Sequence, residues 1–478
     1  SMLLAGCRQP EGQNERWRTG ETEPGHLLVI FVPGFDFEAF SFWLEGLPPE
    51  VQSRLQVAGM SMRTPGPLNL LNNMFTLAYG RFKSAPERWN AYQLSGERLI
   101  HPVGLLKDGE GEGEWGEAAE QLARKGIYTF VLGNSDTPFT LTRTASLIVM
   151  DRQGEAKGIV DETILTQTPN LPGGYRTNWR ALTECLEGIW ATKPASLTVV
   201  ELGDLWRLEG ASPSGKLNSI VKRIYRELWL EEWQLWFGQI TSRIAVLQKP
   251  VTVWIVSPVV SQEAQRKGQL LAPLITWSRE QKGGVLSSPT TRQYGVVANV
   301  DFLPSLLYFF HLSPRKGAYG QPFDLLEEFS HQGEKERLAP FQEHIRYLFA
   351  IYGTRRMVLT VYLSVMIILL ILTALYWWVS RERWGAKVVQ VLIGAMLISP
   401  IFFLWFTPLI KYLSSPIWIG ILLFSSLLAS YLFYRLFNPI IFLTWIGLAN
   451  TVMILLDIWR GSPWMQRSFL EIGRASCR

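Results

Sequence analysis

The sequence predicts a three-layer α/β domain with a largely parallel sheet, followed by an all-α transmembrane helical region. Short apolar runs rich in β-branched and aromatic residues recur before residue 356, and amphipathic stretches separate them. From Met357 onward, long apolar runs alternate with short polar links. A soluble α/β domain joined to membrane helices accounts for both patterns.

Six segments have the composition of buried strands. They are apolar almost throughout rather than alternating, which is typical of strands covered by helices on both faces. The segments are 27–32, 127–132, 146–150, 196–202, 251–256 and 294–300.

Amphipathic stretches lie between these strands, at 116–126, 178–191 and 216–248. Strand patterns that alternate with helix patterns indicate βαβ units and therefore a parallel sheet. The sequence shows no internal repeat that would favour a solenoid instead.

Four apolar stretches are long enough to cross a bilayer core of about 30 Å at about 1.5 Å per residue. They are 357–379, 388–410, 416–434 and 440–456. The first ends in Trp377 and Trp378 and is followed by Arg381, a pattern typical of a helix end at the membrane interface. The lipid bilayer is therefore an expected partner.

The chain divides accordingly into five parts. Residues 1–25 are an amino-terminal tail, 26–335 the α/β domain, 336–356 a juxtamembrane linker, 357–470 four transmembrane helices, and 471–478 a tail with a non-native pattern. The 46 basic and 41 acidic residues of the 478 form no basic block, so nucleic acid is not an expected partner.

The orientation rests on the amino-terminal tail. Leu4-Ala5-Gly6-Cys7 has the form of a bacterial lipoprotein cleavage site or of the end of a trimmed signal anchor. Either reading places the α/β domain outside the cytoplasm of a multi-pass plasma-membrane protein. The basic residues that flank the four spans do not decide the orientation.

Polar residues follow most of the predicted strands, and ligands of such sheets bind beyond the carboxyl ends of the strands. These residues lie in the segments 33–37, 132–137, 150–151, 203–207, 257–258 and 288–304. Turn chemistry alone also accounts for Gly, Asn, Asp, Ser and Pro at these places.

Several of these segments together resemble a family of uncharacterised bacterial membrane proteins that carry an alkaline phosphatase-like domain before multiple transmembrane helices. The resemblance rests on "LGNSDT", "TRTASLIVMDRQGEAKG", "PGGYRT", "VVELGDLWRLE", "VWIVSP" and "GGVLSSPTTRQYGVVANVDFLPSLL". It covers nearly the whole chain and implies an alkaline phosphatase-like fold.

The resemblance also implies a chemistry, from which this sequence departs. Enzymes of the superfamily hold two divalent metals with Asp and His residues at strand ends, and a Thr or Ser at a helix start attacks phosphorus. Here Pro33 stands where the first Asp would be, and Asn69 or Leu70 falls at the nucleophile. Ser257-Pro258 replaces an Asp-His pair.

Two further observations bear on the metal ligands. Asp204 occupies the third-strand position, but Arg207 follows it instead of His. The five His residues stand at 26, 101, 311, 331 and 344, and none follows an Asp at a predicted strand end. No cofactor is expected, and zinc or manganese only under an alternative in which Asp36, Asp151, Asp204 or Asp301 supply the ligands.

Arginine offers a replacement for the metals, because a guanidinium binds phosphate or carboxylate through two hydrogen bonds. Two arrangements remain open. One is an anion pocket, and the other is a closed network in which Asp204 and Asp301 pair with the arginines. The candidates for the pocket are Arg63, Asn134, Asp136, Arg207, Thr291 and Arg292.

The residues leave three functions open. The first is a non-catalytic domain that binds, senses or scaffolds an anionic ligand or a protein of the bacterial envelope. The second is a phosphoryl or related group transferase or hydrolase with an unusual metal site. The third is a component of an envelope transport system, although the four spans contain no interior charge.

Overall fold

The computed structural model describes residues 25–86, 89, 93–95, 98–103, 115–137, 140–169, 171, 173–210, 219–313, 318–328, 338–380, 383–407, 409, 415–436 and 438–459. The predicted leader around Cys7 and the tail 471–478 lie outside these residues.

The strands are short and mostly buried. They are β1 (His26–Phe31), β2 (Gln56–Ser61), β3 (Gln93–Ser95), β4 (Arg98–Ile100), β5 (Tyr128–Asn134), β6 (Glu155–Ile159), β7 (Leu165–Gln167), β8 (Tyr175–Thr177), β9 (Ser196–Leu202), β10 (Val251–Val256), β11 (Leu271–Ser278), β12 (Gly284–Ser287), β13 (Val296–Ala298) and β14 (Asp324–Glu328).

The helices of the α/β domain are α1 (Phe37–Glu45), α2 (Pro49–Gln52), α3 (Leu70–Tyr79), α4 (Glu117–Arg124), α5 (Trp179–Thr192), α6 (Asp204–Gly210), α7 (Ser219–Ala245), α8 (Gln262–Arg266) and α9 (Phe302–Phe309). Three 3₁₀ turns accompany them, η3 (Thr144–Ile148), η4 (Glu162–Ile164) and η5 (Asn299–Asp301). The carboxyl-terminal helices are α10 (Ala339–Ser380), α11 (Arg383–Phe406), α12 (Ser415–Leu436) and α13 (Pro439–Trp459).

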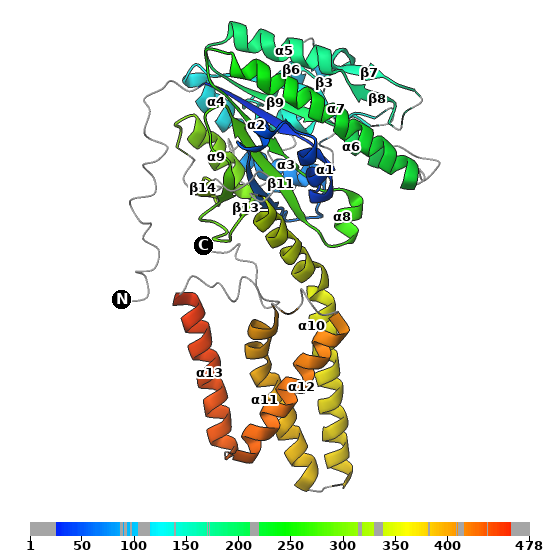
Figure 1. The fold of residues 1–478 in the computed structure, drawn as a ribbon, viewed down its shortest axis with the longest axis vertical. Helices are drawn as coiled ribbons and strands as arrows, with labels where there is room; N and C mark the ends of the chain where they lie inside the picture. Colours follow the sequence, from blue (N-terminus) through cyan, green and yellow to red (C-terminus); the bar gives the residue numbers. More distant parts are fainter. Residues whose placement is uncertain are drawn as a thin grey trace.

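Twelve strands of the described residues form one mixed sheet in the order β14-β12-β2-β11-β10-β1-β9-β5-β6-β4-β3, with β13 beside β2. The central strands β10, β1, β9, β5 and β6 are parallel to one another. Antiparallel strands lie toward both margins, including β11 between β10 and β2. The predicted fold class is confirmed: an α/β domain with a mostly parallel sheet precedes apolar helices (Figure 1).

Helices cover both faces of the sheet. One core contains Trp43 of α1, Leu186 of α5 and Trp233 of α7. The other contains Phe75 of α3 and Leu306 of α9. The strands are apolar throughout because each side chain enters one of these two cores.

The segment 146–150 does not form the predicted strand, because residues Thr144–Ile148 form the turn η3. All five residues of η3 are buried, so the apolar run reflects burial rather than strand geometry. The place beside β5 is taken by β6, where Val131 pairs with Gly158. The predicted strand 294–300 is likewise shorter, since it ends at Ala298 and continues as η5.

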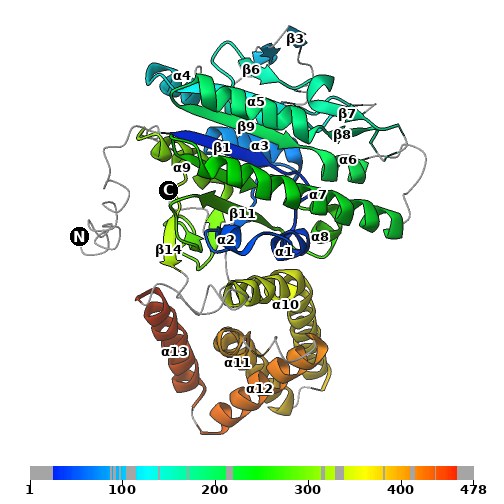
Figure 2. The ribbon, with the colours of Figure 1, turned by 45° about the horizontal axis from the view of Figure 1, so that its top comes forward.

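Helix α10 connects the α/β domain to the membrane region. Its 42 residues correspond to about 63 Å of continuous helix. Residues of the predicted linker 336–356 therefore belong to this helix from Ala339 onward. One face of its first turns is buried, since Phe341, Ile345 and Leu348 lie in the same core as Trp43. Figure 2 shows this part of α10 directly beneath the sheet.

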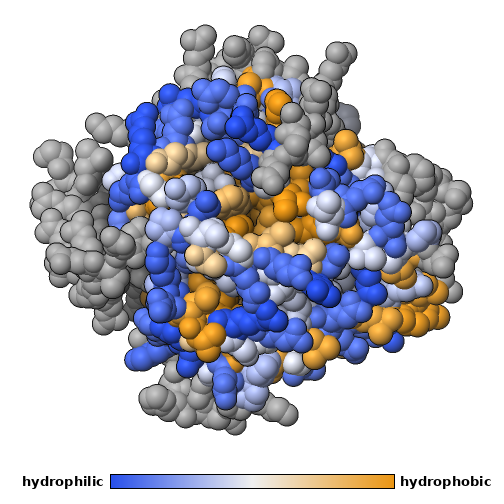
Figure 3. Space-filling view, turned by 90° about the horizontal axis from the view of Figure 1, so that it is seen from above, coloured by the Kyte–Doolittle hydropathy of each residue, from blue (hydrophilic) through white to orange (hydrophobic). Residues whose placement is uncertain are grey.

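Among the described residues, three carboxyl-terminal helices are long and apolar enough to cross a membrane: Ala339–Val379, Lys387–Phe406 and Pro416–Leu436. The fourth predicted stretch forms α13, whose apolar described part, Thr444–Asp457, is shorter. The helices pack through Tyr362, Phe403 and Trp418. Figure 3 shows the opposite end of the molecule, where mostly hydrophilic residues surround smaller hydrophobic patches.

Candidate functional site

The strand-end region comprises the residues that follow the carboxyl ends of β1, β5, β9, β10 and β13. Four of these strands are parallel neighbours in the sheet centre, and β13 is parallel to β2. Their carboxyl ends therefore lie along one edge, where the sequence places its candidate residues. The contacts of these residues decide whether the edge holds an open site.

Asp36 follows β1 and caps the amino terminus of α1. Its Oδ1 accepts hydrogen bonds from the backbone N–H of Ala39 at 2.9 Å and from Arg226 at 2.5 Å. Its Oδ2 accepts one from the Ser261 hydroxyl at 2.5 Å. This carboxylate joins α1, α7 and α8, and its function is structural in this arrangement.

Asp204 and Arg207 form a buried ion pair after β9. Arg207 Nη2 lies 3.3 Å from Asp204 Oδ2, and the side chains are 1% and 6% exposed. Asp204 also accepts hydrogen bonds from the backbone N–H and the hydroxyl of Thr177. Arg207 Nη1 donates to the backbone carbonyl of Asn134 at 2.9 Å. The sequence left an anion pocket and a closed ion-pair network as alternatives, and this pair matches the closed network.

Asn134 and Asp136 follow β5 and are both buried. The Asn134 amide donates to Val160 O at 2.6 Å, and its Oδ1 accepts from the Asp136 N–H. Asp136 binds Arg143 through Nε at 2.8 Å and Nη2 at 2.7 Å. Burial raises the pKa of Asp136, while Arg143 acts to lower it. Arg143, which the sequence analysis did not single out, is the direct partner.

Glu201, near the carboxyl end of β9, is a second residue that the sequence analysis missed. It is 1% exposed, and its Oε2 accepts a hydrogen bond of 2.7 Å from the Ala145 N–H at the start of η3. Burial raises the pKa of Glu201 to about 7. The sequence signal for Glu201 is a Glu within an otherwise apolar strand. Burial there disfavours the charged form of its carboxyl group.

The 288–304 segment holds its own carboxylate with neutral donors. Asp301 is fully buried and accepts hydrogen bonds from Ser288 Oγ at 2.6 Å and Thr290 Oγ1 at 2.5 Å. The backbone N–H groups of Ala298 and Gln321 donate to it at 2.8 and 3.0 Å. Burial raises the pKa of Asp301. The expected pairing of Asp301 with an arginine is not found, because hydroxyl and backbone groups occupy the carboxylate.

Thr291 and Arg292 complete the turn of this segment. The Thr291 hydroxyl donates to the Val296 carbonyl at 2.5 Å. Arg292 is exposed and has a φ of 53°, a conformation rarely adopted by residues other than glycine. Arg63 is exposed as well. Arg63 and Arg292 face solvent whereas Arg207 is buried, so the three arginines do not form one pocket.

The remaining strand end is closed by a pair of buried amides. Asn299 Nδ2 donates to Asn73 Oδ1 at 2.6 Å and to the Arg63 carbonyl at 2.7 Å. Asn73 Nδ2 in turn donates to the carbonyl of Pro258. The weak metal candidate Asp151 lies outside this group and closes a turn, accepting from the N–H groups of Gln153 and Glu155.

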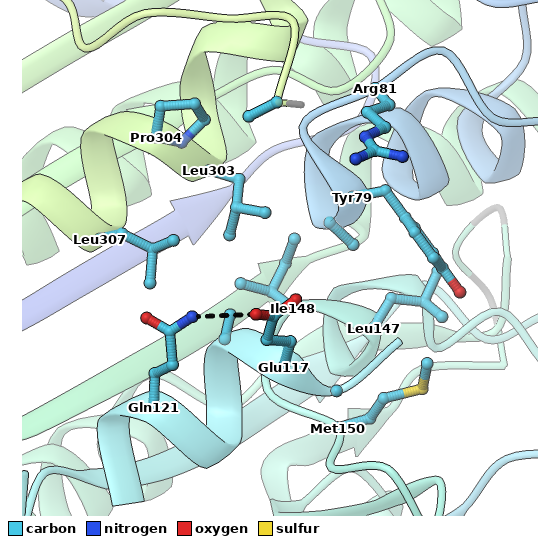
Figure 4. Close-up of a pocket in the computed structure, with 14 residues that line it drawn as sticks. Tyr79, Arg81, Glu117, Gln121, Leu147, Ile148, Met150, Leu303, Pro304 and Leu307 are labelled. Carbon is cyan, nitrogen blue, oxygen red and sulfur yellow. Dashed lines mark hydrogen bonds between the residues drawn. The ribbon is translucent and has the colours of Figure 1, made fainter. Parts of the chain in front are cut away.

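The described residues also line a pocket of about 50 Å³. It is enclosed by the end of α3, the start of α4, η3 and α9 (Figure 4). Leucine side chains and Ile148 form much of its wall, and Gln121 donates to Glu117 at 3.3 Å on one side. The sequence-predicted site residues do not contribute to this lining.

No protein-family model matches the chain, and no curated protein does. Among solved structures, the chain is similar to a protein in the alkaline phosphatase superfamily from Vibrio parahaemolyticus, at 12% identity and a TM-score of 0.42, over 63% of this chain and 70% of that one. It is also similar to a lipoteichoic acid synthase from Listeria monocytogenes, at 9% identity and a TM-score of 0.40, over 63% of this chain and 75% of that one. A third similar structure is a phosphoglycerol transferase from Streptococcus pyogenes in complex with sn-glycerol-1-phosphate. It has 10% identity and a TM-score of 0.38, over 61% of this chain and 75% of that one.

The first of these structures is described as a member of the superfamily that the sequence resemblance indicates. At this level the likeness concerns the fold alone, so the contacts of the strand-end region carry the argument about function.

Proposed function

We propose that the α/β domain is a binding or scaffold module of the bacterial envelope, held on the outer side of the plasma membrane, and that it does not transfer or hydrolyse phosphate esters through a pair of metals. One observation carries the proposal. Asp36, Asp204 and Asp301 each accept at least three hydrogen bonds or ion pairs from groups within the chain.

The strand-end residues do not fit two divalent metals. Such metals require several carboxylate or imidazole atoms that converge with their lone pairs directed at one point. Among the described residues, no group of three or more His, Cys, Asp and Glu side chains has that arrangement. The donors around Asp301 instead direct hydrogens toward both of its oxygens.

The position of the nucleophile also has a structural function. Asn69 is the amino-terminal cap of α3, and its Oδ1 accepts a hydrogen bond of 2.8 Å from the Asn72 N–H. A carboxamide is not a nucleophile comparable to an activated hydroxyl. After β10, the Ser257 hydroxyl donates to the Val259 carbonyl at 2.9 Å and is therefore bound within its own turn.

The docking of α10 supports a scaffold function. The amino-terminal turns of this helix belong to the core of the α/β domain, and its later turns belong to the membrane region. Phe37 of α1 contacts Phe341 and Phe349 with ring centroids 6.0 and 5.8 Å apart. One continuous helix that packs in both regions would hold the domain at a fixed height and orientation above the bilayer.

The exposed arginines remain candidates for binding an anionic ligand. Among the residues proposed for an anion pocket, Arg63 and Arg292 face solvent, whereas Asn134, Asp136 and Arg207 are buried. A guanidinium at the surface can bind phosphate without the cost of opening a buried pair. Any anion site in this region would therefore lie at the turn of the 288–304 segment.

The test uses the full chain purified in detergent. Hydrolysis of p-nitrophenyl phosphate and of bis-p-nitrophenyl phosphate is measured with added zinc or manganese, for the native chain and for Asp204→Asn and Asp301→Asn. We expect no turnover above the uncatalysed rate in any of the three. Metal-dependent turnover that Asp204→Asn abolishes, while tryptophan fluorescence shows an intact fold, would instead support a transferase or hydrolase.

A further inference from the structure

Helix α7 carries large apolar side chains that are exposed on its outer face. Ile220, Ile224, Leu228 and Leu235 are 65%, 48%, 48% and 69% exposed. They follow one another at intervals of four, four and seven residues, so they lie on one face of the helix over about 22 Å. We call these four residues the α7 stripe.

The opposite face of α7 already anchors the helix. Trp229, Trp233 and Phe237 are almost completely buried, and the ring of Trp233 stacks on Trp43 at a centroid distance of 4.7 Å. Core packing thus accounts for the inner face alone. A second apolar face on a helix costs solubility unless it is covered, and a continuous exposed apolar surface marks an interaction site.

Charges beside the α7 stripe are distributed unevenly along the helix. Lys222, Arg226 and Glu232 already pair within the chain, with Glu209, Asp36 and Arg176. The charges next to the stripe that can face a partner are Arg223, before Leu228, and Glu231, after it. Arg223 is 75% exposed and contacts Glu227 at 3.3 Å, which leaves most of its guanidinium available. Glu231 is exposed next to the stripe. Arg223 and Glu231 lie on either side of Leu228, so on two helices that run in opposite directions each faces the opposite charge of the other helix.

We propose that the α7 stripe binds the α7 stripe of a second copy of this chain, with the two helices antiparallel. A twofold axis near Leu228 places Ile220 of one copy opposite Leu235 of the other, and brings Arg223 near Glu231 of the partner subunit. A parallel pair would place like charges opposite each other, which is unfavourable. An interface in which the same patch serves both subunits is the usual form of a homodimer.

The placement of α7 in the molecule fits this arrangement. Figures 1 and 2 show α7 crossing the front of the α/β domain at a steep angle to the membrane part of α10. Two copies in one bilayer are related by an axis along the membrane normal. Helices that run across this axis become antiparallel when they meet, so the membrane anchor and the α7 stripe favour the same dimer.

Disulfide cross-linking tests the axis directly. Leu228→Cys is placed in a full chain whose Cys7, Cys185 and Cys477 are replaced by Ser, and membranes are treated with a mild oxidant. We expect a cross-linked dimer from Leu228→Cys and none from Gln153→Cys, an exposed position beside β6 on another surface. Cross-linking of both to the same extent, or of neither, would overturn the proposal.

A charge exchange tests the direction of the helices. In detergent, Leu228→Asp should raise the dimer dissociation constant at least about tenfold, corresponding to about 1.4 kcal/mol. Arg223→Glu should weaken the dimer and Arg223→Glu with Glu231→Arg should restore it, because the altered charges again face opposite charges in the antiparallel pair. A native chain that is monomeric at every concentration, or a dimer unaffected by Leu228→Asp, would contradict the proposal, including the case in which another protein or lipid covers the α7 stripe.

Discussion

Arg207 Nη2 lies 3.3 Å from Asp204 Oδ2 inside the α/β domain, and neither side chain is more than 6% exposed. The same arginine donates to the carbonyl of Asn134, so it ties the end of β9 to the end of β5. A buried ion pair contributes little net stability, but the loss of one partner leaves an uncompensated charge. The pair therefore closes the edge of the sheet at which a catalytic site would open.

Arg207→Ala should destabilise the domain by about 3–5 kcal/mol, because Asp204 would remain buried without its cation. Arg292→Ala is the matched control: that side chain is exposed, and its loss should shift the melting temperature little. Thermal unfolding of the full chain, followed by tryptophan fluorescence, measures both. Equal effects of the two substitutions would contradict the buried pair.

Glu201 should make stability depend on pH between about 4.5 and 7. Burial raises its pKa from 4.5 to about 7, so in this window the folded domain holds a proton that the unfolded chain has lost. Stability falls with rising pH wherever the folded state binds more protons. The contribution of Glu201 is therefore complete below pH 4.5 and is lost as pH rises to about 7, by about 3 kcal/mol.

Glu201→Gln isolates this contribution, because the amide has a similar shape and does not titrate. His26 and His101 act in the opposite direction, since burial lowers the pKa of each to about 4. They are present in both proteins, so their effect cancels in the difference. Between pH 4.5 and 8, the stability of the native chain in chemical unfolding should fall relative to that of Glu201→Gln as the pH rises. Parallel curves would show that Glu201 does not carry the proton.

Gly295→Ala should weaken the docking of α10. Gly295 has a φ of +66°, and a Cβ there would lie 3.0 Å from a ring carbon of Phe341. Gly126→Ala is the control, because its φ is +74° but nothing lies within 4 Å. Both substitutions strain the backbone by about 1–2 kcal/mol. Gly295→Ala adds overpacking of about 1–3 kcal/mol, which thermal unfolding should resolve.

A second substitution identifies the cause. Phe341→Leu in the Gly295→Ala chain should recover part of the lost stability, because the smaller side chain leaves room for the added methyl group. The same change beside Gly126→Ala should only destabilise. If Gly295→Ala and Gly126→Ala cost the same, the contact between the 288–304 segment and α10 is not tight.

Topology is tested by cysteine labelling in intact cells. We propose that the α/β domain lies outside the cytoplasm and that the end of α10 lies inside. In a chain with its native cysteines replaced, Gln153→Cys should react with a membrane-impermeant thiol reagent, whereas Ser380→Cys should react only after permeabilisation. Labelling of Ser380→Cys alone in intact cells would reverse the orientation.

The central strands could be predicted because a strand that is buried on both faces is apolar at nearly every position. Residues Leu27 to Phe31 are 0% exposed and form a strand that is covered on both faces. The apolar segment at η3 has the same composition, yet Ala145 donates its N–H to Glu201 and the chain turns. The composition of a segment therefore indicates whether it is buried. Its hydrogen-bond partners decide whether it forms a strand or a turn.

The places of two carboxylates in the fold could be predicted, but not their pairings. Asp204 follows β9 and Asp301 follows β13. Asp204 pairs with an arginine three residues away, a separation that a helical turn brings together. Asp301 depends on Gln321, twenty residues later in the chain, for one of its donors. Contacts of that kind follow from the fold and leave no local signal.

The metal content of the purified full chain tests the central claim most directly. The chain is prepared without chelator, dialysed against zinc and manganese and then against metal-free buffer, and its bound metal is measured by mass spectrometry. Because Asp36, Asp204 and Asp301 are occupied by donors within the chain, we expect substoichiometric metal that Asp204→Asn and Asp301→Asn leave unchanged. Two equivalents of zinc or manganese per chain, lost in either variant, would contradict the account.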